Sequence, residues 1–178
     1  IRAHQVGAVT AMVLFRVDAD HRAGLGHLQR SLSLAAALRA KSLESIFFTQ
    51  ADSHRGERIR EFGFPICTHP TVDSWTDQDA KATLAAADHH GCDAIMVDSH
   101  DVEADYLALL RNAGRYVIAR DDLASYPFPC QMVFNGNADA PQLAYCSSSG
   151  DSVFLLGMEY IVLRQEYQEK PPGEVRQS

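Results

Sequence analysis

Short apolar runs alternate along the chain with longer segments in which apolar residues recur every three or four positions. The short runs predict strands, and the longer segments predict amphipathic helices. The predicted strands are 13–17, 45–49, 65–68, 94–97, 116–119, 132–134 and 153–156, and the predicted helices are 28–41, 57–62, 77–90 and 102–112. This alternation is typical of repeated βαβ units, so we expect an α/β fold with a Rossmann-like parallel sheet and helices on both faces.

The two ends of the chain differ from the segment between them. Met12 opens a run that leads directly into the first predicted strand, so we interpret residues 1–11 as an extension or a cloning remnant. Pro171 and Pro172 can neither continue a helix nor pair inside a sheet. We therefore expect one Rossmann-like domain at residues 12–168, and a linker-like tail at 169–178 that leads toward an absent second lobe.

The composition favours a small-molecule ligand. The 178 residues are 46% hydrophobic and 22% charged, and the formal net charge of −7 comes without any run of Lys or Arg. Nucleic acids and anionic membranes attract basic surfaces, so we expect neither as a partner. No apolar stretch approaches the roughly 20 residues of a membrane span. The apolar run 11–15 is too short for a signal peptide, and we expect the cytoplasm as the compartment.

The cysteines and histidines do not form a convincing metal site. The four cysteines are far apart in the sequence, so we interpret them as reduced and structural. His89 with His90, and Asp98 with His100, are the close sets that a metallohydrolase would use. Adjacent histidines on a helix point in different directions, which makes this alternative the weaker one. We expect no metal and no cofactor.

Polar residues follow the predicted strands at the ends where ligands bind in open parallel sheets. These residues are Asp18, Asp98, Asp121, Asp122 and Asn135. They are expected to face one crevice. The alternative for any single one is that it terminates a strand or caps a helix, which Asp and Asn do routinely.

Gly24 and Gly26 are predicted to lie between the first strand and the first helix. Without side chains, they let backbone N–H groups approach an anionic oxygen, and the start of the helix adds partial positive charge. Position 29 is Gln29 instead of the third glycine of the dinucleotide-binding pattern, so a nicotinamide cofactor is not expected.

His27 and Arg30 follow these glycines on the predicted helix. The positive end of the helix favours a neutral His27 ring, which suits a general base. Arg30 lies one turn further along and can bind a phosphate or a sugar oxygen, or pair with Asp18. The alternative is that His27 only packs at the helix start and Arg30 is a surface charge.

An ordered series of segments carries a family resemblance over residues 12 to about 167. The segments are 15–18, 24–30, 97–99, 121–124, 135–137 and 155–160. They resemble the UDP-sugar hydrolase of pseudaminic acid biosynthesis and the related spore-coat polysaccharide biosynthesis proteins, which are similar to glycosyltransferase B enzymes. The resemblance implies that the chain is the N-terminal lobe of a two-lobe glycosyltransferase B-like fold.

The resemblance also implies an activity and a set of site residues. The reaction is release of UDP from UDP-2,4-diacetamido-2,4,6-trideoxy-β-L-altropyranose, with His27 activating a water for attack at the anomeric carbon and no metal. The partner is a UDP-linked sugar. The implied substrate-binding residues are Arg16, Asp18, Gly24, Gly26, Arg30, Asp98, Ser99, Asp122, Asn135, Asn137 and Tyr160.

The chain departs from the family pattern in three places. His100 stands where the family usually has Tyr, and Gly136 stands where a longer polar residue is common. The second lobe, which carries most of the nucleotide-binding residues, is not part of this sequence. Two other functions therefore stay open: a glycosyltransferase in which His27 deprotonates an acceptor hydroxyl, and a non-catalytic sugar-binding or assembly module. A homodimer and a separate second lobe both stay open as partners.

Overall fold

The computed structural model describes residues 11–17, 24–49, 53–69 and 72–163. They form one seven-stranded sheet in the order β3-β2-β1-β4-β5-β6-β7, with every neighbouring pair of strands parallel. The strands are β1 (Met12–Val17), β2 (Glu44–Thr49), β3 (Ile66–Thr68), β4 (Ala94–Asp98), β5 (Tyr116–Arg120), β6 (Met132–Asn135) and β7 (Val153–Leu156). The expected Rossmann-like parallel sheet is confirmed.

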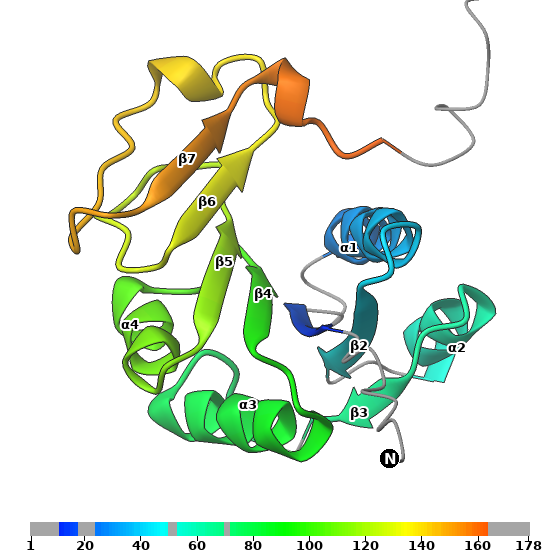
Figure 1. Cartoon of the computed structure of the whole chain (residues 1–178). Helices are drawn as coiled ribbons and strands as arrows, with labels where there is room; N and C mark the ends of the chain where they lie inside the picture. Colours follow the sequence, from blue (N-terminus) through cyan, green and yellow to red (C-terminus); the bar gives the residue numbers. More distant parts are fainter. Residues whose placement is uncertain (1–10, 18–23, 50–52, 70–71, 164–178) are drawn as a thin grey trace, which may run out of the picture.

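Helices cover both faces of this sheet, as expected. The α-helices are α1 (Gly24–Arg39), α2 (Ser53–Glu61), α3 (Asp77–His90) and α4 (Ala104–Asn112), and the 3-10 helices are η1 (Ala140–Gln142) and η2 (Met158–Tyr160). Figure 1 shows α1 and α2 on one face, with α3 and α4 on the other. The strand order reverses between β1 and β4, and in such sheets this switch point is where ligands bind.

Three helix starts differ from the sequence prediction. Helix α1 begins at Gly24, so Gly24 and Gly26 belong to its first turn and not to a preceding loop. Glycine disfavours a helix interior, but the N–H groups of a first turn have no partner within the helix, so a glycine costs less there. Helix α2 begins at Ser53, ahead of its first apolar residue, whereas α4 begins only at Ala104 because Glu103 is extended with φ −105° and ψ 165°.

The sheet separates two apolar layers. Leu14, Ile95 and Val97 pack toward α3 and α4, whereas Phe15 and Met96 pack toward α1. Neighbouring residues of a strand point to opposite faces, so the central strands are apolar on both sides. Burial of each such side chain contributes about 1.5–3 kcal/mol to folding.

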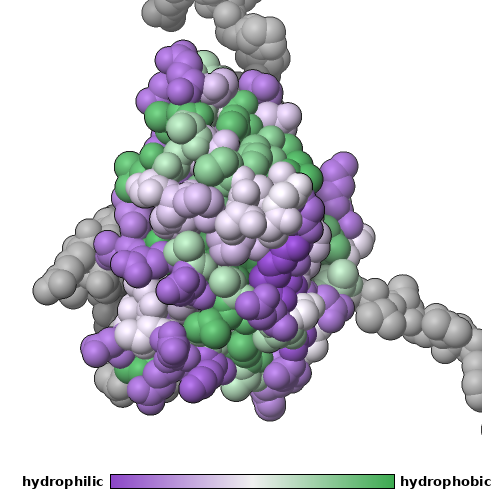
Figure 2. Space-filling view, turned by 90° about the vertical axis from the view of Figure 1, so that its left-hand side faces the viewer, coloured by the Kyte–Doolittle hydropathy of each residue, from purple (hydrophilic) through white to green (hydrophobic). Residues whose placement is uncertain are grey.

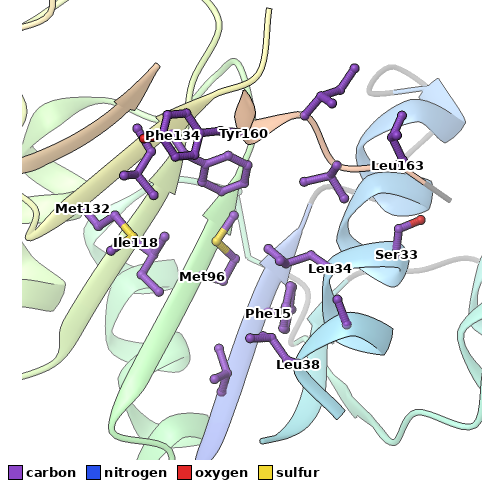
Figure 3. Close-up of a pocket in the computed structure, with 15 residues that line it drawn as sticks. Phe15, Ser33, Leu34, Leu38, Met96, Ile118, Met132, Phe134, Tyr160 and Leu163 are labelled. Carbon is purple, nitrogen blue, oxygen red and sulfur yellow. The ribbon is translucent and has the colours of Figure 1, made fainter. Parts of the chain in front are cut away.

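One part of the α1 face is not covered by a helix. The connection between β5 and β6 runs over the opposite face, where Phe128 and Cys130 pack with residues of α4. The segment 157–163 crosses this part of the α1 face instead. A groove of about 370 Å³ remains between that segment and α1 (Figure 3). Its walls are apolar and include Phe15, Leu34, Leu38, Met96, Ile118 and Phe134. We call this feature the apolar groove.

Strand β7 is one edge strand of the sheet, and it lies with α4 on the left-hand side of Figure 1. Figure 2 views this side and shows hydrophobic residues interspersed among hydrophilic ones. Val153 of β7 and Leu109 of α4 are among the exposed hydrophobic side chains.

None of the helices in the described part of the chain is long and apolar enough to cross a membrane.

Candidate functional site

His27 lies in the first turn of α1 and faces the carboxyl end of β4. Its Nδ1 is 2.6 Å from Oδ1 of Asp98, and the two side chains are only 9% and 1% exposed. An ionised carboxylate accepts hydrogen bonds but cannot donate them, so Nδ1 carries the ring proton. This leaves Nε2 of His27 as the nitrogen that can take a proton from a ligand.

Two further groups hold the Asp98 carboxylate. Ser31 donates a hydrogen bond from Oγ to Oδ2 at 3.1 Å, and Nη1 of Arg120 lies 3.4 Å from Oδ1. Ser31 is four residues after His27, so the two side chains share one face of α1. Asp98 is therefore fixed from both α1 and β5, and the orientation of the His27 ring is fixed with it.

Asp122 forms the second half of the cluster. Arg120 donates from Nη2 to both of its oxygens at 2.7 and 2.8 Å, His100 lies 3.1 Å away through Nε2, and Asn137 donates from Nδ2 at 3.0 Å. Burial alone would raise the pKa of Asp122, but the Arg120 charge and the His100 hydrogen bond outweigh it and lower this pKa. Asp122 is therefore a carboxylate at neutral pH.

The two histidines of the cluster touch each other. The ring centroids of His27 and His100 are 4.5 Å apart with an interplanar angle of 79°. Arg120 bridges the two carboxylates that hold these rings, and its side chain is only 6% exposed. The cluster is thus one connected network built from α1, the ends of β4 and β5, and the loop after β6.

Arg30 is a cation without a counter-ion within the described ranges. No hydrogen bond or ion pair joins it to another described residue, and its buried Nε has no partner there. Burial and the neighbouring Arg120 lower the pKa of Arg30, while Asp98 and Asp122 act in the opposite direction. A guanidinium nevertheless stays charged in proteins. Arg30 therefore adds a positive charge near Asp98 and Asp122.

Asn135 and Ser99 support the surrounding loops. Asn135 is fully buried, donates to the Tyr145 hydroxyl at 3.0 Å, and accepts from the backbone N–H of Asn137 at 2.9 Å. The Ser99 Oγ accepts from the backbone N–H of Asp101 at 3.1 Å. These contacts place Asn137 against Asp122. Asn135 itself contacts Asn137 and Tyr145 and supports the cluster from the buried side.

Arg16 lies in a different cluster, on the α3 face of the sheet. It is 1% exposed and donates to Asp79 at 2.8 and 3.2 Å, and its guanidinium stacks 4.1 Å from the centre of the Trp75 ring. Asp79 also receives His69 at 2.6 Å. Arg16 therefore forms a buried ion pair that joins β1 to α3, and its contact with a substrate stays a prediction.

Two other predicted site residues, Tyr160 and Asp18, are not found beside His27 among the described residues. Tyr160 lines the apolar groove and is 38% exposed (Figure 3). Gly136 lies so close to the same segment that a Cβ on it would be 2.7 Å from Cα of Ile161. Asp18 falls outside the described residues. Gly24 and Gly26 lie in the first turn of α1, beside the cluster.

The sequence-based prediction missed Ser31 and Arg120. It considered His100 as a departure from the family and, with Asp98, as part of the weaker metal-binding alternative. Ser31 had a usable signal, because its spacing of four from His27 puts it on the same helix face. Arg120 directly precedes Asp121 and Asp122 in an otherwise apolar strand, which also marks a strand end. No three His, Cys, Asp or Glu side chains come together as a metal site in the portion of the chain that the structure covers.

Comparison with known proteins adds a distant relative and several structural neighbours. No family model matches the chain. The chain is 26% identical over 160 residues to the uncharacterised protein MJ1062 of Methanocaldococcus jannaschii, covering 84% of this chain and 30% of that protein. At this identity, the pseudaminic acid hydrolase family is not confirmed. The chain also spans less than a third of this relative.

The solved structures that resemble the chain share its fold at low sequence identity. A glycosyltransferase from Rickettsia africae has a TM-score of 0.59 at 11% identity, with 82% of this chain and 42% of that one covered. MurG of Acinetobacter baumannii gives 0.53 at 11%, with 71% and 41% covered. Anabaena Alr3699/HepE, solved with UDP and glucose, gives 0.50 at 14%, with 81% and 43% covered. The chain therefore has the Rossmann-like α/β fold of glycosyltransferase B-type proteins and spans less than half of each.

Proposed function

We propose that this chain is the base-bearing lobe of an enzyme that acts on a nucleotide-linked sugar. His27 takes the proton from an oxygen nucleophile while that oxygen attacks the anomeric carbon. The observation that carries the proposal is the 2.6 Å hydrogen bond from His27 to Asp98, which leaves Nε2 free at the carboxyl edge of the sheet. A histidine held this way is suited to general base catalysis, which contributes typically 10²–10⁴-fold to a rate.

Arg30 and the first turn of α1 supply the positive charge that a diphosphate needs. The first N–H groups of a helix have no partner within the helix and attract anions. Gly26 is exposed there, and among the described residues outside its own helical turn the nearest atom to a Cβ on it would be Nη1 of Arg30, at 3.9 Å. A phosphate can thus approach the backbone and the Arg30 guanidinium together. The UDP in the HepE structure supports a uridine diphosphate sugar as the ligand class.

Water is the first nucleophile to test, because the sequence resembles a UDP-sugar hydrolase. Transfer to an acceptor hydroxyl is the second candidate, and it is supported by the similarity to the Rickettsia africae glycosyltransferase. In both reactions His27 plays the same chemical part, so the fold and the base do not separate them. The products do: free sugar marks hydrolysis, and a glycoside marks transfer.

The test is UDP release from a panel of UDP-sugars by the whole gene product, with and without His27→Ala. We expect His27→Ala to lower kcat by about 10²-fold or more, because Nε2 is the only proton acceptor assigned to the nucleophile. His89→Ala is the matched control, since His89 is exposed at the far end of α3 and touches His90 instead of the site.

The outcomes separate the proposal from its alternatives. Unchanged kcat in His27→Ala rules out the base. Sugar binding by calorimetry without any UDP release across the panel, both in water and with added sugar acceptors, indicates a non-catalytic sugar-binding module. Release that disappears in His27→Ala and persists in His89→Ala supports the proposal.

A further inference from the structure

His100 and His27 stand in the site as two similar units. Each ring is held by one carboxylate: His27 by Asp98 at 2.6 Å and His100 by Asp122 at 3.1 Å. In each pair the ring nitrogen at the carboxylate carries the proton, so the other nitrogen is left for a ligand. For His27 this is Nε2, and for His100 it is Nδ1.

The two units are tied together but differ in their exposure to solvent. Arg120 contacts both carboxylates, and the ring centroids lie 4.5 Å apart. The His27 side chain is 9% exposed, whereas that of His100 is 48% exposed. His100 is therefore the more accessible of two rings that lie in direct contact.

Several charged groups belong to the same network as His100. Arg30 and His27 come from α1, Asp98 from β4, and Arg120 and Asp122 from the end of β5. Asp101 lies next to it on its own loop. Among these groups, Asp122 accepts the His100 hydrogen bond and is anionic at neutral pH.

We propose that His100 is a second catalytic residue, the general acid that protonates the departing phosphate oxygen. The inference rests on the proposed function and adds the partner that His27 needs. The nucleophile's oxygen bonds to the anomeric carbon as its proton passes to Nε2 of His27. His100 enters this step with a proton on both ring nitrogens. The bond from that carbon to the phosphate oxygen breaks with its electron pair, and this oxygen takes the proton from Nδ1 of His100, which leaves a neutral ring with its proton on Nε2. Solvent afterwards removes a proton from His27 and returns one to His100.

The acid role has a signature in the pH dependence of kcat/KM. A base that must be unprotonated and an acid that must be protonated give a bell-shaped profile. Replacing the acid removes the alkaline limb, so kcat/KM no longer falls as the pH rises. The test compares His100→Gln with the unaltered gene product and with the control His89→Gln, using UDP release across the pH range.

We expect His100→Gln to lower kcat by about 10²-fold, to lose the alkaline limb and to keep its melting temperature, because the side chain is half exposed. An unchanged rate overturns the inference. A reduced rate with both limbs intact also overturns it, because His100 then contributes only to binding or packing. The His27→Ala result is separate: if His27→Ala is inactive while His100→Gln is normal, the base stands and the acid falls.

Discussion

Asp98 acts on the site through His27. Its carboxylate receives Nδ1 of His27, Oγ of Ser31 and Nη1 of Arg120, and it is 1% exposed. Such a group is a positioning residue, because it fixes which ring nitrogen carries the proton and where the other one points. The same arrangement in other enzymes holds a catalytic histidine in the tautomer that the reaction requires.

For Asp98→Asn we predict a fall in kcat of about 10²-fold or more with little change in KM. An Asn side chain has one acceptor oxygen and one donor amide, so it cannot accept from His27, Ser31 and Arg120 as a carboxylate does. The measurement is steady-state kinetics together with the nitrogen NMR shifts of the His27 ring. The shifts should report a change of tautomer, whereas Asp93→Asn, exposed before β4, should leave them unchanged. Lost activity with an unaltered tautomer contradicts the positioning role.

Among the individual residues of the cluster around His27, the sequence identified some, but it did not identify Arg120, which joins them. His27 was recognisable from its place after the glycines, and Asp98 and Asp122 from their places after apolar strands. Arg120 was not, because a basic residue at the end of a strand is usually a surface charge. Only the packing of β5 beside β4, with Asp98 in register with Arg120, shows that its guanidinium lies between the two carboxylates.

Among the elements, the start of α3 is fixed to the sheet by Asp79. Its carboxylate accepts from Arg16 of β1, from His69 after β3, and from the backbone N–H of Trp75. Burial alone would raise the pKa of Asp79, but hydrogen bonds from His69 and Arg16 and the Arg16 charge hold it well below its ordinary value. The Arg16–Asp79 ion pair therefore stabilises the fold only while Asp79 is ionised.

We predict that Asp79→Asn lowers the free energy of unfolding at pH 7 by about 3–5 kcal/mol, because Arg16 is left buried without its counter-ion. The pKa of Asp79 is depressed in the fold, so its contribution is present above the unfolded pKa and is lost as the pH falls below about 4. Urea unfolding between pH 7 and pH 3 measures this, with Asp105→Asn on the exposed side of α4 as control. The difference in free energy of unfolding between the unaltered protein and Asp79→Asn should become smaller as the pH falls. A difference that does not change with pH contradicts the stabilising role of ionised Asp79.

The two faces of α1 differ in how much space they offer. Ala35 is fully buried against the sheet, whereas Ala37 is exposed and lines the apolar groove. Ala37→Leu should change the free energy of unfolding by less than about 0.5 kcal/mol, because the larger side chain extends into open apolar space. Ala35→Leu should cost about 1–3 kcal/mol through overpacking. Thermal unfolding of the two variants tests this, and equal losses would mean that the groove is filled in the protein.

Across the whole molecule, the sequence predicted all seven strands and the parallel arrangement. Strand prediction succeeded because β1, β4 and β5 are apolar runs bounded by polar residues, a pattern that follows from burial on both faces. Helix starts were less accurate, since the first turn of α1 contains two glycines and α2 is almost entirely polar. The uncovered region of the α1 face had no sequence signal, because the pattern of apolar residues does not show which face of the sheet each connection crosses.

The fit between the loop after β6 and the segment at Ile161 limits what mutation can do at Gly136. Every other amino acid has a Cβ, and a Cβ at this position would lie 2.7 Å from the Cα of Ile161, a backbone atom that no rotamer change can move aside. No single amino-acid substitution at this position is therefore conservative. Even the change to alanine must displace a stretch of main chain. Natural variation at position 136 is consequently expected to appear only together with compensating changes near position 161.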